Sequence, residues 1–364
     1  MKIKIIIFYI VFLLSLSNIY SQKVNIKLEE LWTIGNDEKA TMDYIFKNPI
    51  HLLIDSKMNI YLHEEHAPDI KKYSPEGKYI GKTGRPGEGP GEFRVLYNIA
   101  INKKNEIIAF DIAMKRITYY DDKLKLIKTQ NINSIIEPYY FSALNSSALL
   151  VSDIQEIRKS HILFSIYNND MKEKKEQFGN MSELINFKDD YQAIFSFLWN
   201  IFVIDEANIL ATPAWYSQVS YNYKKDNGKW ILNKLTGMKP TRQSYEIIDK
   251  AEYFKLAKKD GYVSGGPRDK KVFAKINHES IGIYSYKKYI IQLFLHNNFN
   301  GTSNFMANVF SMKGEYLGQS IIKSVQNNSA PALFLNVDKL GNVYIKENID
   351  KVPVIKKYRV IISN

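Results

Sequence analysis

An internal repeat, whose two clearest copies lie 47 residues apart, constrains the fold of this chain more than any other feature. Each copy reads as a short apolar strand, a turn that contains Asp or Asn, a buried strand, a loop and two further strands. This order predicts one four-stranded antiparallel sheet per copy. The two clearest copies align Asp55 with Asn102, Ile60 with Ile107, Ile70 with Ile117 and Tyr73 with Tyr120.

Weaker copies continue along the chain. A four-stranded sheet cannot bury both of its faces alone, but radial stacking against neighbouring sheets buries them. We therefore expect an all-β fold, a six-bladed β-propeller, rather than an open solenoid, which would need polar capping units. Residues 28–34 form a spare strand, which we expect to pair with residues 355–362 and close the ring. The six units lie near residues 50–80, 97–127, 141–179, 198–232, 280–318 and 331–362.

The segment at about 233–279 does not follow the repeat. Residues 22–364 are expected to form a single propeller domain, with a partly helical insertion at about 233–279. Within it, residues 245–259 carry helix formers with apolar side chains at helical spacing, which predicts a short amphipathic helix. Two interpretations remain open: an insertion that packs on the ring, or a lid over the mouth of the central channel.

The first 21 residues follow the pattern of a secretory signal peptide. Lys2 and Lys4 precede an apolar stretch at 5–16, and small residues lead to an expected cleavage site after Ser21. The apolar stretch is shorter than the roughly 20 residues that span a bilayer, so we expect no stable membrane insertion after cleavage. The sequence predicts an exported protein, periplasmic or secreted, and the lack of cysteine excludes a lipoprotein anchor.

Cysteine content and charge exclude several classes of function. With no cysteine, the chain has no disulfide framework, no cysteine–metal site and no thiol nucleophile. Loss of the two signal lysines lowers the formal charge from +12 to +10. The remaining lysines are scattered and are not interleaved with a recognition motif, so we expect no nucleic-acid partner. We expect a monomer.

Two stretches of the first unit carry a family resemblance. Residues 59–61 and 70–78 (IKKYSPEGK) resemble the NHL-type propeller repeat. Residues 81–93 (GKTGRPGEGPGEF) resemble the IGRxGxGPGEF signature of exported six-bladed β-propellers common in Bacteroidetes. The resemblance implies a six-bladed ring and export, and it supplies no substrate or catalytic residue. The chain departs from the usual pattern at Leu62-His63-Glu64, where such repeats carry a small residue and an aspartate.

The glycine-rich stretch 84–91 is the most distinctive local motif. Its glycines and prolines fix a non-helical loop, which either connects two units or presents backbone N–H groups as an anion nest beside Arg85. Arg85 and Glu92 are therefore candidate ligand-binding residues. A phosphate-binding P-loop is excluded, because Glu76 stands where the first glycine is required and the prolines prevent the following helix.

The run His63-Glu64-Glu65-His66 places two imidazoles and two carboxylates close together in sequence. His63 and Glu64 are candidate ligand-binding residues, and His63 and His66 are candidate metal ligands. The alternative is a polar loop at the end of a strand, because the run is not HExxH and Pro68 disfavours a helix.

A third set of polar residues recurs once per unit, in the turn after the first strand. Recurrence favours a structural role, because Asp and Asn side chains accept hydrogen bonds from backbone N–H groups two residues on. No GxSxG elbow and no calcium-loop spacing is present. The recurring residues are Asp55, Asn102, Asp205 and Asp338.

These patterns predict an exported binding or protein-interaction propeller, with its site at the mouth of the channel, where loops from several blades converge. A glycan, a peptide or another exported protein is the expected partner, and no cofactor is expected. The alternative function is a metal-assisted hydrolase or lyase, with zinc or calcium in the central channel. Fold alone does not decide between a binding protein and an enzyme.

Overall fold

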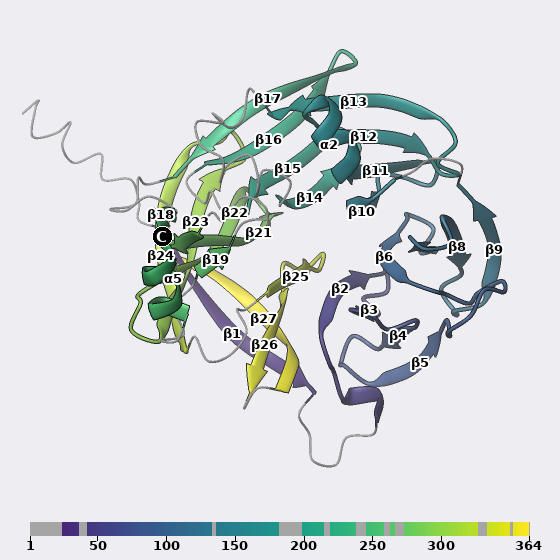
Figure 1. Cartoon of the computed structure of the whole chain (residues 1–364), viewed down its shortest axis with the longest axis horizontal. Helices are drawn as coiled ribbons and strands as arrows, with labels where there is room; N and C mark the ends of the chain where they lie inside the picture. Colours follow the sequence, from purple (N-terminus) through teal and green to yellow (C-terminus); the bar gives the residue numbers. More distant parts are fainter. Residues whose placement is uncertain are drawn as a thin grey trace, which may run out of the picture.

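The chain folds into a ring of six antiparallel sheets around a central axis (Figure 1). The computed structural model describes residues 24–35, 42–132, 136–181, 199–214, 219–237, 245–257, 263–265, 273–326, 333–349 and 352–363. The expected signal peptide, residues 1–21, lies outside them.

The first three blades follow the predicted units, with the innermost strand first in sequence. A 3-10 turn, η1 (Met42–Tyr44), precedes blade 1, and a short helix, α2 (Ile154–Ser160), joins two strands of blade 3. Blade 1 contains β2 (Pro49–Ile54), β3 (Ile60–Glu64), β4 (Ile70–Tyr73) and β5 (Tyr79–Thr83); blade 2 contains β6 (Leu96–Ile101), β7 (Ile107–Asp111), β8 (Arg116–Tyr120) and β9 (Leu126–Asn131); blade 3 contains β10 (Pro138–Ala143), β11 (Ala148–Asp153), β12 (Ile162–Asn168) and β13 (Lys174–Asn180).

Blades 4 and 5 have the same order, and blade 6 combines the two ends of the chain. Blade 4 contains β14 (Trp199–Asp205), β15 (Asn208–Pro213), β16 (Val219–Asp226) and β17 (Lys229–Thr236); blade 5 contains β21 (His278–Tyr286), β22 (Tyr289–Asn297), β23 (Thr302–Ser311) and β24 (Tyr316–Gln326); blade 6 contains β25 (Leu333–Val337), β26 (Val343–Ile349), β27 (Val352–Ser363) and β1 (Asn25–Ile34).

The N-terminal strand closes the ring as the sequence predicts. β1 is the outermost strand of blade 6 and pairs with β27 from Asn25↔Ser363 to Ile34↔Ile355. This pairing covers the edge that β27 would otherwise expose, which is how a ring avoids edge-to-edge association.

Apolar packing between blades holds the ring together. Strands such as β3 and β7 are buried along their whole length, whereas the outer strand β5 alternates between half-buried and exposed residues. Each junction between consecutive blades has its own apolar cluster, including the one that joins the last blade to the first. There, Tyr344 and Ile355 of blade 6 pack with Leu52 and Tyr73 of blade 1. An open solenoid would leave this cluster exposed, so the alternative of a solenoid is wrong.

Asparagine side chains on innermost strands add polar ties between blades. Each donates its amide to a carbonyl of the next blade's innermost strand, which satisfies a backbone group that strand pairing leaves free. The three bonds run from Asn98 Nδ2 to Pro138 O (3.1 Å), from Asn200 Nδ2 to Ser280 O (2.7 Å) and from Asn336 Nδ2 to Leu52 O (2.8 Å).

The recurring Asp and Asn residues cap turns, as their recurrence predicts. Asp55 Oδ1 accepts hydrogen bonds from the backbone N–H groups of Lys57 (2.9 Å) and Asn59 (2.8 Å). The same pattern of side chain to backbone occurs at Asn102, Asp205 and Asp338. Their role is structural.

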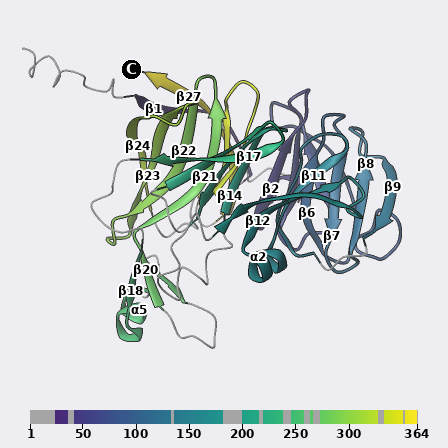
Figure 2. The ribbon, with the colours of Figure 1, turned by 90° about the horizontal axis from the view of Figure 1, so that it is seen from above.

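The insertion forms a small sheet of its own from β18 (Tyr245–Ile248), β19 (Val263–Gly265) and β20 (Phe273–Ile276), with strand order β18-β20-β19. It also contains one helix, α5 (Lys250–Ala257). The helix is shorter than the sequence predicts: the first four residues of the expected helix are a strand, whose β-branched residues pair with β20. Figure 2 shows the insertion and α2 on one side of the ring. Among the described residues, no helix is long and apolar enough to cross a membrane.

Candidate functional site

The innermost strands of five blades enclose a cavity of about 610 Å³ on the axis of the ring, which we call the central channel. Residues of β2, β6, β10, β14 and β25 line it. Because these strands run in the same direction, the channel has two different ends. At the turn end, the innermost strands lead into the Asp/Asn-capped turns; at the opposite end, which we call the tyrosine end, the innermost strands begin.

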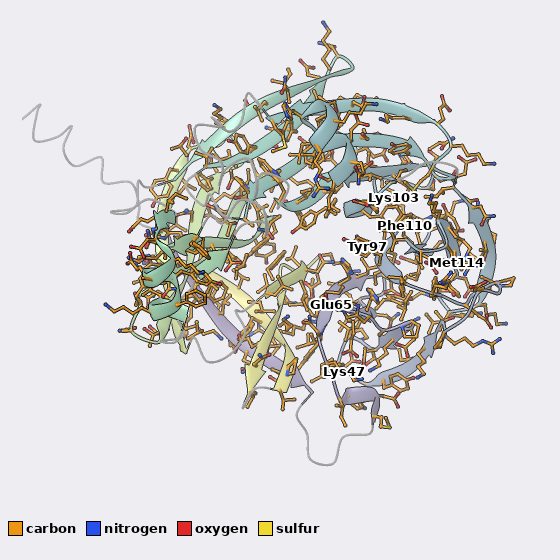
Figure 3. All side chains as sticks on the ribbon, in the orientation of Figure 1. Lys47, Glu65, Tyr97, Lys103, Phe110 and Met114 are labelled. Carbon is orange, nitrogen blue, oxygen red and sulfur yellow. The ribbon has the colours of Figure 1, made fainter. Side chains whose placement is uncertain are left out.

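Polar side chains tie the turn end together across the channel. Figure 3 shows Lys103 at the inner side of blade 2, beside the middle of the ring. From there its ammonium group reaches past blade 3 to blade 4. The bonds run from Lys103 Nζ to Glu206 Oε1 (2.6 Å), from Asn145 Nδ2 to Glu206 Oε2 (2.9 Å), from Asn105 Nδ2 to Ser56 Oγ (2.8 Å) and from Lys339 Nζ to Ser56 O (2.9 Å).

At the tyrosine end, three consecutive blades carry a β-bulge at the same place. In each innermost strand one residue is skipped in the pairing with the second strand, and that residue is Ile50, Tyr97 or Tyr139. A bulge changes the direction of the side chain of the extra residue. The Tyr97 ring packs partly against the apolar cluster between blades 2 and 3. Both tyrosines are half-buried, Tyr139 lines the channel, and Figure 3 shows Tyr97 beside the middle of the ring.

The electrostatics of the two tyrosines show which groups surround them. Burial, with smaller contributions from the nearby groups Tyr97 and Glu279, raises the pKa of Tyr139 to about 12. Burial also raises the pKa of Tyr97, with contributions from Glu137 and Glu65. Carboxylates of blades 1, 3 and 5 therefore lie around two aromatic rings of blades 2 and 3.

Glu279 stands out among these carboxylates. It lies on β21, the innermost strand of blade 5, and burial raises its pKa to about 7. Its Oε2 atom is buried, and no hydrogen-bond donor within the described part of the chain reaches it. Glu137, by contrast, accepts a hydrogen bond from the Gln155 amide (2.9 Å).

His63 is fully buried and pairs with another histidine, not with its sequence neighbours. It lies opposite His51 in the β2–β3 pairing, with their Nδ1 atoms 3.2 Å apart and their rings stacked. Burial lowers the pKa of His51 to about 3 and that of His63 to about 4, so both imidazoles are neutral at pH 7. A second histidine pair with the same Nδ1 spacing, His278 with His296, joins β21 to β22.

Glu64 accepts a backbone hydrogen bond at the position where aspartates do so in blades 2 and 3. Its Oε2 accepts the backbone N–H of Lys47 (2.5 Å), just as Asp111 accepts that of Arg94 and Asp153 that of Glu137. Its Oε1 accepts the ammonium of Lys71 (3.0 Å). The unusual residue of the first unit is thus a longer carboxylate in the same structural position.

The candidate metal ligands do not converge. His66 has a side chain that is 86% exposed, whereas His63 is buried against His51, and both oxygens of Glu64 are occupied by donors of the chain. No group of three His, Asp or Glu side chains with metal-binding geometry occurs in the described segments. The residues of this run therefore do not fit the metal site of the alternative function.

Arg85 and Glu92 face each other across the glycine-rich loop. The Glu92 carboxylate accepts Arg85 Nη2 (2.7 Å) through Oε1 and the backbone N–H of Gly89 (2.8 Å) through Oε2. A Cβ at Gly87 would lie 2.1 Å from Glu92 Oε2, so the loop closes tightly on this carboxylate. Arg116 of β8 fastens the loop to blade 2 through the carbonyls of Glu88 and Glu92. The loop thus surrounds an anion that the chain itself supplies.

The sequence interpretation missed Tyr97, Tyr139, Glu279 and the partner of His63. One signal was present: the 47-residue offset aligns Tyr97 with Ile50, so the repeat has an aromatic residue where its first copy has an aliphatic one. No pattern in the sequence marked Glu279, because its importance depends on neighbours from other blades.

Comparison with known proteins gives a family and a fold. A family model described as a six-bladed β-propeller, DUF5128, matches residues 40–287. The structure is similar to that of a protein of Bacteroides fragilis NCTC 9343 described as exported, with 10% identity, 95% of this chain and 97% of that chain covered, and a TM-score of 0.56. It is also similar to a DUF4221 family member from Bacteroides vulgatus ATCC 8482, with 12% identity, 94% and 100% covered, and a TM-score of 0.58. No curated protein sequence matches the chain.

Proposed function

The chain belongs to the DUF5128 family of six-bladed β-propellers, and we propose that it is an exported ligand-binding propeller whose site is the tyrosine end of the central channel. The bulged tyrosines carry this proposal. Three blades have the same bulge, and in blade 3 it places an aromatic ring, Tyr139, in the lining of the channel. The second bulged ring, Tyr97, lies near Tyr139 and packs partly against the apolar cluster between blades 2 and 3. Aromatic residues with one polar tip suit ligand contact, because a ring offers apolar area while its hydroxyl directs a hydrogen bond.

The asymmetry of the channel supports this choice of end. Side chains of blades 1, 2, 3, 4 and 6 are hydrogen-bonded to one another at the turn end, so a ligand there would have to replace these bonds. The cavity has a size typical of small-molecule sites, which are about 300–1,000 Å³. A small molecule, the end of a glycan or a side chain of a peptide or exported partner protein fits this volume.

Export is the second part of the proposal. Residues 1–21 have the three-part pattern of a signal peptide, and a structural neighbour is described as exported. Mass spectrometry of the protein from a fractionated culture tests it: a periplasmic or secreted chain that begins at Gln22 is expected. A cytoplasmic chain that retains residues 1–21 would contradict it.

A binding screen tests the site. The mature protein is screened against arrays of glycans and peptides and a panel of small polar molecules, and each hit is measured again with Tyr97→Ala/Tyr139→Ala. Loss of both rings should weaken a channel ligand roughly tenfold or more. Ile127→Ala, on the outer strand β9, is the matched control and should bind as the wild type does. Hits whose affinity is the same in both variants would place the site elsewhere.

A further inference from the structure

We propose that the tyrosine end of the channel binds an ammonium group, with the carboxylate of Glu279 as its counter-ion and the rings of Tyr97 and Tyr139 beside it. This inference rests on the proposed function and specifies the chemistry of its ligand.

The unpartnered oxygen Oε2 of Glu279 is the first observation: this atom is buried, whereas the residue as a whole is half-buried. Buried charged groups are normally paired, because moving an isolated carboxylate out of water is costly. Other interior carboxylates are satisfied within the chain: Glu64 and Glu347 form ion pairs with Lys71 and Lys323 (2.5 Å), and Asp111 accepts backbone N–H groups. Glu279 Oε2 has neither an ion pair nor a hydrogen-bond donor among the residues that the structure describes. A donor supplied by a ligand would satisfy it.

The surroundings of Glu279 favour a positive ligand. Tyr139 lies close enough for the Glu279 charge to raise its pKa, and Tyr97, with Glu65 and Glu137 near it, extends the same surface. The face of an aromatic ring attracts a cation through its quadrupole, and carboxylates nearby add to the negative potential. Lys346, whose pKa Glu65 influences, is engaged with another group, since its Nζ donates to Asn48 Oδ1 (2.8 Å).

A neutral ligand would use this arrangement less well. An alcohol or a sugar hydroxyl can donate one hydrogen bond to Glu279, but it gains nothing from the negative potential around the rings. An ammonium group donates up to three hydrogen bonds and supplies the missing charge. Because burial raises the Glu279 pKa to about 7, a bound cation would also restore its ionised form.

The ammonium can come from a free amine or from a lysine side chain, and the experiment separates these sources. Isothermal titration of the mature protein compares n-butylamine with 1-butanol, and a short lysine peptide with the same peptide acetylated on Nζ. We expect both cationic probes to bind and both neutral counterparts to bind roughly tenfold more weakly or not at all. Binding of n-butylamine alone would identify a small amine as the ligand, and tighter binding of the peptide would identify a lysine side chain.

Variants assign the effect to Glu279. Glu279→Gln keeps the shape of the side chain and should weaken the cationic probes roughly tenfold or more, with little effect on the neutral ones. Glu206→Gln, at the turn end, is the matched control and should leave their affinity unchanged. If Glu279→Gln does not fold, the comparison of n-butylamine with 1-butanol in the wild type decides alone.

The outcomes separate the two proposals. Equal binding of charged and neutral probes, an unchanged affinity in Glu279→Gln, or no binding of either cationic probe would overturn the ammonium site. A neutral hit from the binding screen that depends on Tyr97 and Tyr139 would then still support the channel as the binding site. Hits that are indifferent to the tyrosines would overturn both.

Discussion

Replacing the buried histidine pair of blade 1 should make the protein more resistant to acid. In the native state the pKa of His51 is about 3 and that of His63 about 4, both below the ordinary value of 6.5. Each native imidazole therefore stays neutral at a pH at which the unfolded chain takes up a proton. Protonation of the unfolded chain therefore does not reduce the stability above pH 6.5. Below pH 6.5 it stabilises the unfolded state, and the protein loses stability as the pH falls towards the native pKa values.

The size of the effect follows from these pKa values. At pH 5 each imidazole favours the unfolded state by about 2 kcal/mol, since one pH unit corresponds to about 1.36 kcal/mol. The pair together removes about 4 kcal/mol between pH 7 and pH 5, a large part of the 5–15 kcal/mol that typically stabilises a domain.

The chain itself offers the replacement. Blade 2 has Asn98 opposite Phe110 at the register position where blade 1 has His51 opposite His63. His51→Asn/His63→Phe copies that pair and removes both titrating groups. Urea unfolding followed by tryptophan fluorescence at pH 7, 6 and 5 gives the free energy of unfolding of each protein.

The expected result is a difference in slope. The wild type should lose about 4 kcal/mol more than the double variant between pH 7 and pH 5. His66→Asn removes an exposed histidine and leaves the pair intact, so its curve should follow the wild type. If wild type and double variant lose the same stability, the pair titrates in the native state as it does in the unfolded chain, and the reasoning from burial is wrong.

Three further predictions concern the ring and its loops. Asn98→Ala leaves the Pro138 carbonyl without its donor and should cost about 1–3 kcal/mol in urea unfolding; a change below about 0.5 kcal/mol would show that water replaces the amide. Gly87→Ala should expel the Glu92 carboxylate from the glycine-rich loop, because φ at this position is 147° and the new Cβ would meet Glu92 Oε2. Limited proteolysis should then cut the loop faster than in the wild type, and an unchanged cleavage rate would contradict this. Deleting β1 (Asn25–Ile34) should expose the edge of β27 and give aggregates or dimers in gel filtration, whereas a monomer with unchanged thermal stability would show that closure is dispensable.

The fold could be predicted from the sequence because its signals are local and recur. The turn after the first strand needs a side-chain acceptor at one position, and Asp55, Asn102, Asp205 and Asp338 supply it. The strand at 28–34 could be assigned to the last blade because the C-terminal segment of the chain supplies only three strands of that blade. The helix of the insertion was less predictable, since residues 245–248 satisfy a helical pattern and a strand pattern equally, and pairing with β20 decides between them.

His63 and His66 do not converge in the structure, because neighbours in sequence need not be neighbours in space at the end of a strand. His63 still belongs to β3, so its side chain lies in the packed interior against His51, twelve residues earlier. His66 lies in the turn beyond, with φ 61°, and its side chain points into solvent. Two histidines three residues apart converge on a helix, but a strand that ends between them sends them in different directions.

The tyrosine end could not be found from alternation, for a related reason. An alternating pattern assigns each residue of an innermost strand to one of two packed faces, and a bulge adds a residue whose direction the alternation does not predict. The repeat nevertheless contains the information. Positions that every blade needs for packing keep their character, as Ile60 and Ile107 do, because each blade must fill the same space against its neighbours. The bulge position changes from Ile50 to Tyr97 and Tyr139 while its geometry stays the same, so the rings there are not required by the repeat. In a ring of equivalent blades, a side chain that departs from its counterparts at an unchanged backbone position is not explained by the packing that all blades share, and for this reason we propose the ligand site there.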